Sequence, residues 1–83
     1  MPRLLTQEDV ITSTKQVISE ILSIDEISLT DTIQSLGMDE MHKIEALMDI
    51  ESALRVTFND MCLENIDHMT VVEFAKHISA YIL

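Results

Sequence analysis

The chain has 83 residues, 47% of them apolar, and carries fifteen acidic against five basic side chains, a formal net charge of −10. This length gives a single domain over residues 1–83 with a modest core. Such an acidic balance repels a phosphate backbone and argues against nucleic acid as a partner, whereas it attracts basic protein surfaces over long range. Acidity can also serve solubility alone, so charge does not by itself identify a partner.

Gly37 and Pro2 are the only glycine and proline. So few helix-breaking residues predict an all-α chain. The first helix is predicted from Gln7 to Ser23, with Thr6 as its N-cap. Its apolar residues recur at helical spacing and predict one buried stripe: Val10, Ile11, Val17, Ile18, Ile21 and Leu22. The connection over residues 24–38 is too apolar for a free loop, and we expect it to lie across the helices.

The second helix is predicted from Asp39, its N-cap, to Arg55, with an inner face made by Ile44, Leu47, Met48 and Leu54. A short third helix is predicted over Met61–Ile66. The fourth is predicted over Thr70–Ile82, where Thr70 and Glu73 match a capping box. Three longer helices, one short helix and a long first loop predict a small four-helix bundle.

The run Leu36–Met41 reads Leu-Gly-Met-Asp-Glu-Met. It resembles the Leu-Gly-x-Asp-Ser-Leu signature of the acyl carrier protein and peptidyl carrier protein family. The resemblance implies a bundle of the acyl carrier protein type, in which the serine carries acyl or aminoacyl groups on a phosphopantetheine arm. Gly37 and Asp39 match this signature, whereas Glu40 stands at the position of the serine.

The resemblance continues along the second helix and into the fourth. Residues 64–71 resemble the third helix of the family and its Thr-Val entry into the last helix. On the second helix the matching positions are Met41, Ile44, Glu45, Leu47, Met48, Glu51 and Leu54. His42 and Ser52 depart from it, because the family often has acids there, and Lys43 is expected to add a positive charge to the same face.

Glu40 cannot accept the arm by phosphoryl transfer, which requires an alcohol nucleophile, so we predict a chain without phosphopantetheine. Ser35 lies nearby, but using it as the attachment point would break the apolar register of the second helix. Three explanations of Glu40 stay open. The acid stabilises the helix start through the macrodipole after loss of the carrier role, its charge mimics the phosphodiester of the arm, or a serine was deliberately replaced.

The combined pattern predicts a non-catalytic protein that binds basic surfaces of acyl- or aminoacyl-transferring enzymes in fatty-acid, polyketide or nonribosomal-peptide biosynthesis. The expected partner-binding residues share the exposed face of the second helix: Asp39, Glu40, Met41, Ile44, Glu45, Asp49 and Glu51. Two alternatives remain. One is a working carrier whose serine has been substituted in this chain, and the other is an acidic helical chaperone or adaptor.

Other residue types give weaker signals. Cys62 is the only cysteine, which fits a reducing compartment. No neighbour is expected to lower the pKa of its thiol, and the nearby acids are expected to raise it. The histidines His42, His68 and His77 lack paired metal-ligand spacing, so we expect no metal site. The methionines are interpreted as flexible core filler or as a soft surface for an acyl chain or a partner. Residues 1–10 show no secretory signal, and no apolar stretch is long enough to span a membrane, so we expect a soluble, cytoplasmic monomer.

Overall fold

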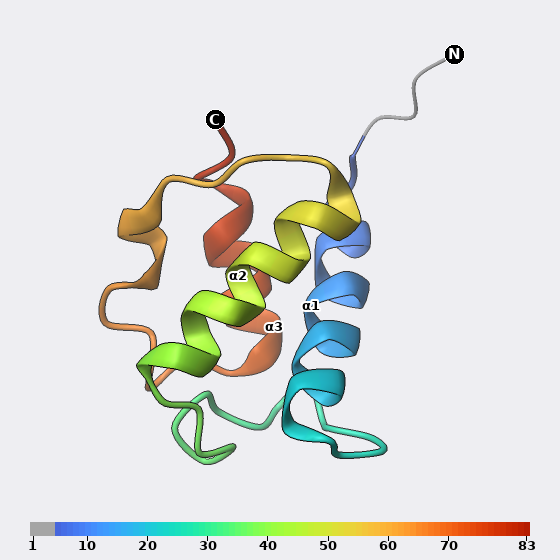
Figure 1. Ribbon diagram of the computed structural model, residues 1–83, viewed down its shortest axis with the longest axis vertical. Coiled ribbons are helices and arrows are strands. Elements are labelled where there is room, and N and C mark those ends of the chain that lie inside the picture. Colours follow the sequence, from blue (N-terminus) through green and yellow to red (C-terminus); the bar gives the residue numbers. More distant parts are fainter. Residues whose placement is uncertain (1–4) are drawn as a thin grey trace.

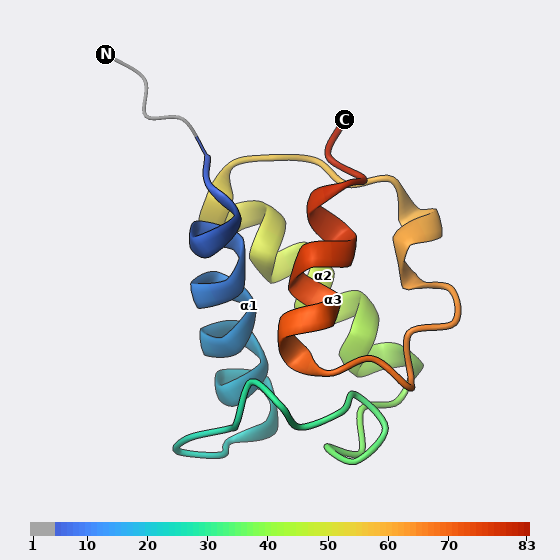
Figure 2. The same ribbon diagram turned by 180° about the vertical axis from the view of Figure 1, so that it is seen from behind.

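The computed structural model describes residues 5–83; residues 1–4, which belong to the segment expected to lack a secretory signal, lie outside the described residues. These described residues form three α-helices: α1 (Gln7–Leu22), α2 (Glu40–Leu54) and α3 (Val71–Ser79). A 3-10 helix, η1 (Asp60–Leu63), lies between α2 and α3 in the chain (Figures 1 and 2). Within residues 5–83 the backbone forms isolated bridges but no strand. The all-α class is confirmed, whereas the count of four helices is not.

Side-chain caps fix the start of each α-helix, at the three residues that the sequence indicated. The Asp9 N–H donates to Thr6 Oγ1 at 3.2 Å, and the Thr6 N–H donates back to Asp9 Oδ2 at 3.0 Å. Thr70 and Glu73 make the same reciprocal pair at the start of α3. Because the Glu73 carboxylate accepts the Thr70 N–H, its pKa lies below the ordinary value.

The helix ends depart from the predictions at η1 and α3. Glu64 is extended and Asn65 has a φ of 55°, so the short helix stops at Leu63 and does not reach Ile66. The last residues leave α3 to pair with the segment before η1: the Asn59 N–H donates to the Tyr81 carbonyl at 2.9 Å. The Leu83 N–H donates to the Thr57 carbonyl at 2.8 Å. These long-range bonds end the helix at Ser79 and not at Ile82.

The core forms where α1 packs against both α2 and α3, which lie at the front and the back of the molecule in Figure 1. The long connection over residues 24–38 closes the end of the bundle where α2 and α3 begin, as Figure 2 shows. Ile27 and Ile33 of this connection are buried, which confirms that it lies across the helices. Its backbone is held to the start of α3, since the Val71 N–H donates to the Asp31 carbonyl at 2.9 Å.

The buried face of α2 differs from the predicted one. Leu47 is buried and Leu54 is partly buried, as expected, but Ile44 and Met48 are 46% and 60% exposed. The residues that α2 turns toward the core are instead Lys43, Ala46, Leu47 and Ile50. Apolar residues occur on both sides of this helix, so apolar spacing alone did not identify the side that is covered. Within residues 5–83, no helix combines the length and apolar composition needed to cross a bilayer.

Thr14, on the buried side of α1, is fully buried, and its Oγ1 has no hydrogen-bond partner among the residues that the structure describes. A hydroxyl held out of water without a partner destabilises a fold by about 1–3 kcal/mol. We therefore expect Thr14→Val, which keeps the shape and removes the hydroxyl, to raise the free energy of unfolding by about 1 kcal/mol or more. Chemical denaturation measures the change. Thr14→Ser keeps the hydroxyl and loses a methyl group, so a stabilising effect of that variant would contradict this explanation.

Candidate functional site

The candidate site begins where the long connection turns into α2. Gly37 has a φ of +73°, and nothing lies within 4 Å of the position that a Cβ would occupy, so glycine is favoured here by conformation and not by space. Asp39 then adopts an extended conformation and accepts the His42 N–H at 2.8 Å. This cap makes residue 40 the first residue of α2.

Glu40 projects into solvent from the first turn of α2, with 87% of its side chain exposed. Its Oε1 lies 3.5 Å from Lys43 Nζ. The side chain is neither packed in the core nor remote from a helix start, two placements that would have contradicted its assignment. Ser35 is engaged elsewhere: its hydroxyl donates to the Thr32 carbonyl at 2.9 Å and accepts the Thr32 N–H at 3.0 Å.

Lys43 lies beneath Glu40, and its environment differs from the one that the sequence indicated. Its side chain is only 9% exposed, and Nζ is 2.6 Å from Asp67 Oδ1. The hydrogen bond to Asp67 raises the pKa of Lys43 against the opposing effect of burial, with a smaller contribution from Glu40. We expected Lys43 to add a positive charge to the exposed face of α2. The structure shows that it does not, because its ammonium is paired with Asp67. It ties the start of α2 to the segment before α3.

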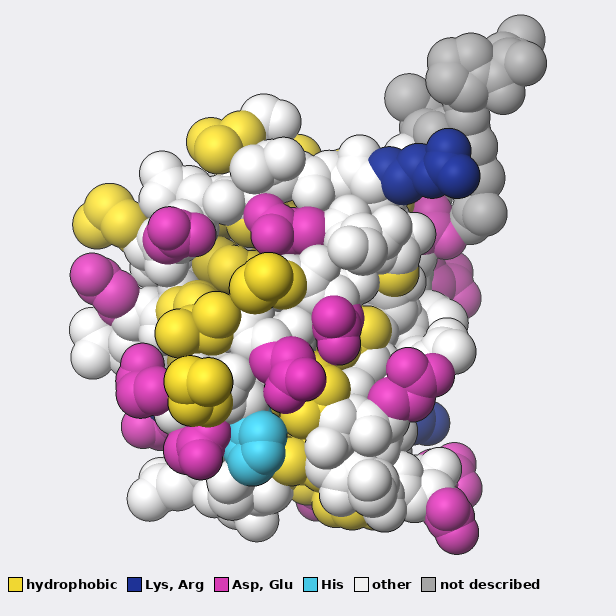
Figure 3. All heavy atoms as spheres, in the orientation of Figure 1, with side chains coloured by type: hydrophobic (Ala, Val, Ile, Leu, Met, Phe, Trp, Pro, Cys, Tyr) yellow, Lys and Arg dark blue, Asp and Glu magenta, His cyan; other side chains and the backbone are white. Residues whose placement is uncertain are grey.

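The outer face of α2 carries an uncovered apolar stripe made of Met41, Ile44 and Met48, which we call the methionine stripe. Met41 is 73% exposed, and the spacing of three and then four residues places all three side chains on one side of the helix. Figure 3 shows hydrophobic side chains gathered over α2 with acidic side chains around them. Exposed methionines of this kind make adaptable binding surfaces.

Acids border the methionine stripe on both sides. At about 100° per residue, Glu40 and Glu51 fall on one side of the stripe and Glu45 and Asp49 on the other. Glu40, Glu45 and Asp49 are exposed, whereas Glu51 is half-buried. The Glu51 carboxylate accepts the Phe58 N–H at 2.8 Å, so it also holds the segment before η1 against α2. All seven predicted partner-binding residues thus lie along α2 and its cap, six of them exposed and one partly engaged in the fold.

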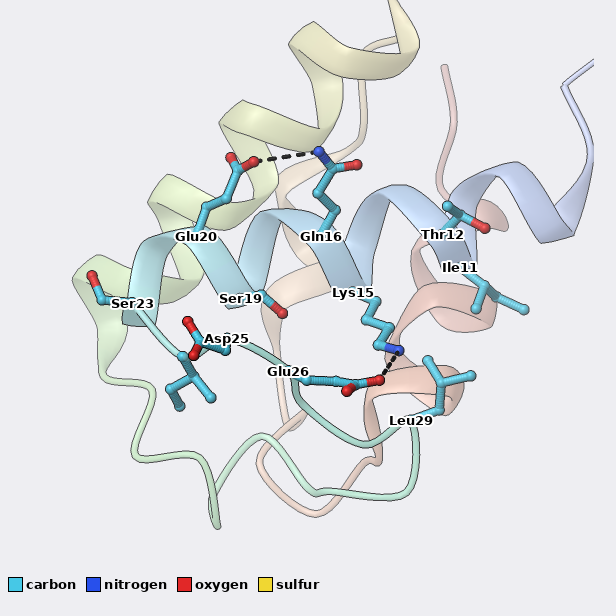
Figure 4. Close-up of a pocket in the computed structure, with 11 residues that line it drawn as sticks. Ile11, Thr12, Lys15, Gln16, Ser19, Glu20, Ser23, Asp25, Glu26 and Leu29 are labelled. Carbon is cyan, nitrogen blue, oxygen red and sulfur yellow. Dashed lines mark hydrogen bonds and ion pairs between the residues drawn. The ribbon is translucent and has the colours of Figure 1, made fainter.

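A separate hollow of about 870 Å³ lies between α1 and residues 23–29 (Figure 4). Its floor includes Ile11 and Leu29, and Lys15 pairs with Glu26 at 3.8 Å across it. Side chains of both charges line it, and it contains none of the predicted site residues. The hollow is open and its charged groups are already paired or solvated, so it presents no reactive arrangement.

Cys62 is buried, and burial followed by the charge of Asp60 raises the pKa of its thiol to about 11. The thiol is therefore protonated at neutral pH and does not act as a nucleophile. His77 Nε2 is 3.0 Å from the Cys62 carbonyl oxygen, and His42 takes part in the cap of α2. Over residues 5–83, no three side chains of the metal-binding types converge on one point.

Comparison with known proteins gives one relative by sequence. Over 76 residues the chain is 33% identical to the acyl carrier protein of Thermotoga maritima, and the match covers 88% of this chain and 91% of that protein. No family model matches the chain. No solved structure gives a significant match either.

Proposed function

The chain belongs to the acyl carrier protein family, and from that membership we propose a carrier-like protein without a phosphopantetheine arm that binds acyl- or aminoacyl-transferring enzymes. The observation that supports the missing arm is Glu40, exposed at the first residue of α2, where the family signature has its serine. A carboxylate supplies no hydroxyl for phosphoryl transfer. In this proposal η1 corresponds to the short third helix of the family and completes its four-helix arrangement.

The proposed partner surface is the outer face of α2. The methionine stripe supplies apolar contact, and the acids on both sides of it favour a basic partner. Self-association of this face is disfavoured, because it would bring two acidic rims of a chain with a net charge of −10 together. The partner class that fits is therefore a basic surface of a biosynthetic enzyme and not a second copy of the chain.

Glu40 keeps a negative charge at the point from which a phosphodiester would extend in an armed carrier. Lys43 stands 3.5 Å from this carboxylate but is paired more closely with Asp67, so the group of three side chains retains a net negative charge. In our proposal this fixed anion lets a partner that recognises the loaded carrier dock on the unloaded one. The macrodipole of α2 stabilises the same charge.

Incubation with coenzyme A and a broad-specificity phosphopantetheinyl transferase tests the proposal. We expect the intact mass of the natural chain to stay unchanged, and the mass of Glu40→Ser to rise by one phosphopantetheine group. The gain is expected because Gly37, Asp39 and the start of α2 already present position 40 to solvent. Mass spectrometry of the intact protein reads out both results.

Two further variants sharpen this experiment. Glu40→Ala removes the carboxylate without supplying a hydroxyl and is expected to remain unmodified. Combining Glu40→Ser with Ser35→Ala is expected to keep the gain in mass, which assigns the arm to position 40. A gain in mass by the natural chain would refute the unarmed state, and failure of Glu40→Ser to react would count against recognition of α2 by carrier-dependent enzymes.

A further inference from the structure

The described sulfur-containing side chains range from buried to exposed, with Met69 partly buried between the two extremes. Met38 is 6% exposed, and Cys62 is buried with a thiol that stays protonated at neutral pH. In contrast, Met41 and Met48 are 73% and 60% exposed, and both lie in the methionine stripe. Met61 in η1 is also exposed. A two-electron oxidant in solution therefore reaches thioethers of the proposed partner surface before it reaches the thiol or the buried thioether.

We propose that Met41 and Met48 form an oxidation site through which peroxides weaken docking at the α2 face. The inference rests on the proposed function, because it assigns a regulation to that same surface. The co-reactant is a hydroperoxide such as hydrogen peroxide. A lone pair of the thioether sulfur attacks one peroxide oxygen, the S–O bond forms as the O–O bond breaks, and sulfur loses two electrons. The hydroxylated sulfur then loses the proton on its new oxygen to give the sulfoxide, and the released hydroxide takes up a proton to give water.

Conversion of both side chains to sulfoxides removes most of the apolar character of the stripe. Met41 and Met48 are two helical turns apart, about 10 Å along α2, and Ile44 between them would be the single apolar side chain left in the stripe. A sulfoxide is polar and carries no net charge. The bordering acids keep their charges, so long-range attraction of a basic partner continues while the close contact weakens.

This division of roles predicts which rate constant responds. Steering by charge sets the association rate, whereas short-range apolar contact sets how long a complex lasts. Oxidation is therefore expected to raise the dissociation rate constant by about tenfold, with little change in the association rate constant. The fold is expected to survive, because neither side chain belongs to the buried core.

The first experiment needs no partner. The full chain is treated with graded hydrogen peroxide, and peptide mass mapping follows the addition of one oxygen at each methionine. Met41 and Met48 are expected to react before Met38, with unchanged helical circular dichroism and earlier elution from a hydrophobic-interaction column. Methionine sulfoxide reductases are expected to restore the original elution. Equal reaction rates at Met38, or loss of helicity in step with oxidation, would overturn the assignment.

The second experiment measures binding of a carrier-dependent acyltransferase by surface plasmon resonance. The double variant Met41→Leu, Met48→Leu keeps an apolar stripe that cannot be oxidised. Its dissociation rate constant is compared before and after peroxide treatment of the same variant, and is expected to stay the same even though Met61 is still oxidised. If the oxidised natural chain binds as well as the untreated one, or the double variant stays sensitive, the oxidation site is refuted and the proposed function stands. If the untreated chain binds no such enzyme, the proposed function fails, and the order of oxidation and the column elution still decide whether the modification site exists.

Discussion

Replacing Asp67 with alanine is expected to lower the free energy of unfolding by about 2–3 kcal/mol, a large effect for a side chain that is itself 60% exposed. The effect arises at its partner. The Lys43 side chain is only 9% exposed and its Nζ sits 2.6 Å from Asp67 Oδ1, and without this carboxylate its ion pair with Glu40 at 3.5 Å remains. Removing Asp67 is costly because a largely buried lysine loses its nearest compensating charge.

The opposite truncation, Lys43→Met, is expected to cost less than about 1 kcal/mol. Methionine keeps an apolar stem of similar length in the same place, and the two carboxylates released from the pair return to solvent. Denaturation in urea at neutral pH measures both variants. Equal costs for the two substitutions would show that the ammonium is effectively solvated and would contradict the asymmetry.

The pH dependence of stability provides an independent check on the same ion pair. Asp67 raises the pKa of Lys43 above its ordinary value of 10.5. A group with a raised pKa in the fold contributes stability fully below its unfolded pKa, and the contribution is lost as the pH rises through the folded value. The pair is thus intact at neutral pH. As the pH rises through the folded pKa of Lys43, the free energy of unfolding is expected to fall, and Lys43→Met is expected to lack this part of the decrease.

The helix starts could be predicted from the sequence because their causes are local. Thr6, Asp39 and Thr70 each bond to a backbone N–H three residues ahead, so the necessary partners stand next to one another in the chain. The end of α3 could not be predicted in this way. It depends on backbone hydrogen bonds between residues 57–59 and residues 81–83. The local sequence of α3 does not indicate these long-range bonds.

The start of α2 was predictable from the sequence, whereas the side of α2 that is buried was not. The cap at Asp39 and the exposed start at Glu40 follow from local chemistry. The burial of Lys43 follows from Asp67, a residue that reaches it only through the fold. Lys43, predicted to be exposed, lies on the inner side of α2, and Met48, predicted to be buried, is exposed. Ile44, which the sequence assigned both to the inner face and to the partner-binding face, is exposed. Met48 therefore joins Met41 and Ile44 on the outer face of α2. The sequence had assigned only Met41 and Ile44 of this methionine stripe to the partner-binding face.

Reversing two charges beside the methionine stripe is expected to slow partner association by about tenfold or more at low salt. The change is Glu45→Lys with Asp49→Lys, which converts one border of the stripe from acidic to basic. Both side chains are exposed, and within residues 5–83 neither makes a hydrogen bond or ion pair that would couple the change to folding. Glu51 is left intact because its carboxylate holds the Phe58 N–H. Stopped-flow or plasmon resonance kinetics with a carrier-dependent acyltransferase measures the rate.

The matched control is Asp25→Lys with Glu26→Lys, which changes the net charge equally but lies at the hollow beside α1 (Figure 4). It breaks only the exposed pair of Glu26 with Lys15, and such pairs contribute little to stability. If net charge alone steered the partner, both double variants would slow association to the same extent. A local effect of the α2 border predicts a much larger slowing for Glu45→Lys with Asp49→Lys, together with a loss of the salt dependence that the control retains. Charges nearest the contact have the largest effect on electrostatic steering. Equal association rates for the two double variants would therefore contradict docking at the outer face of α2.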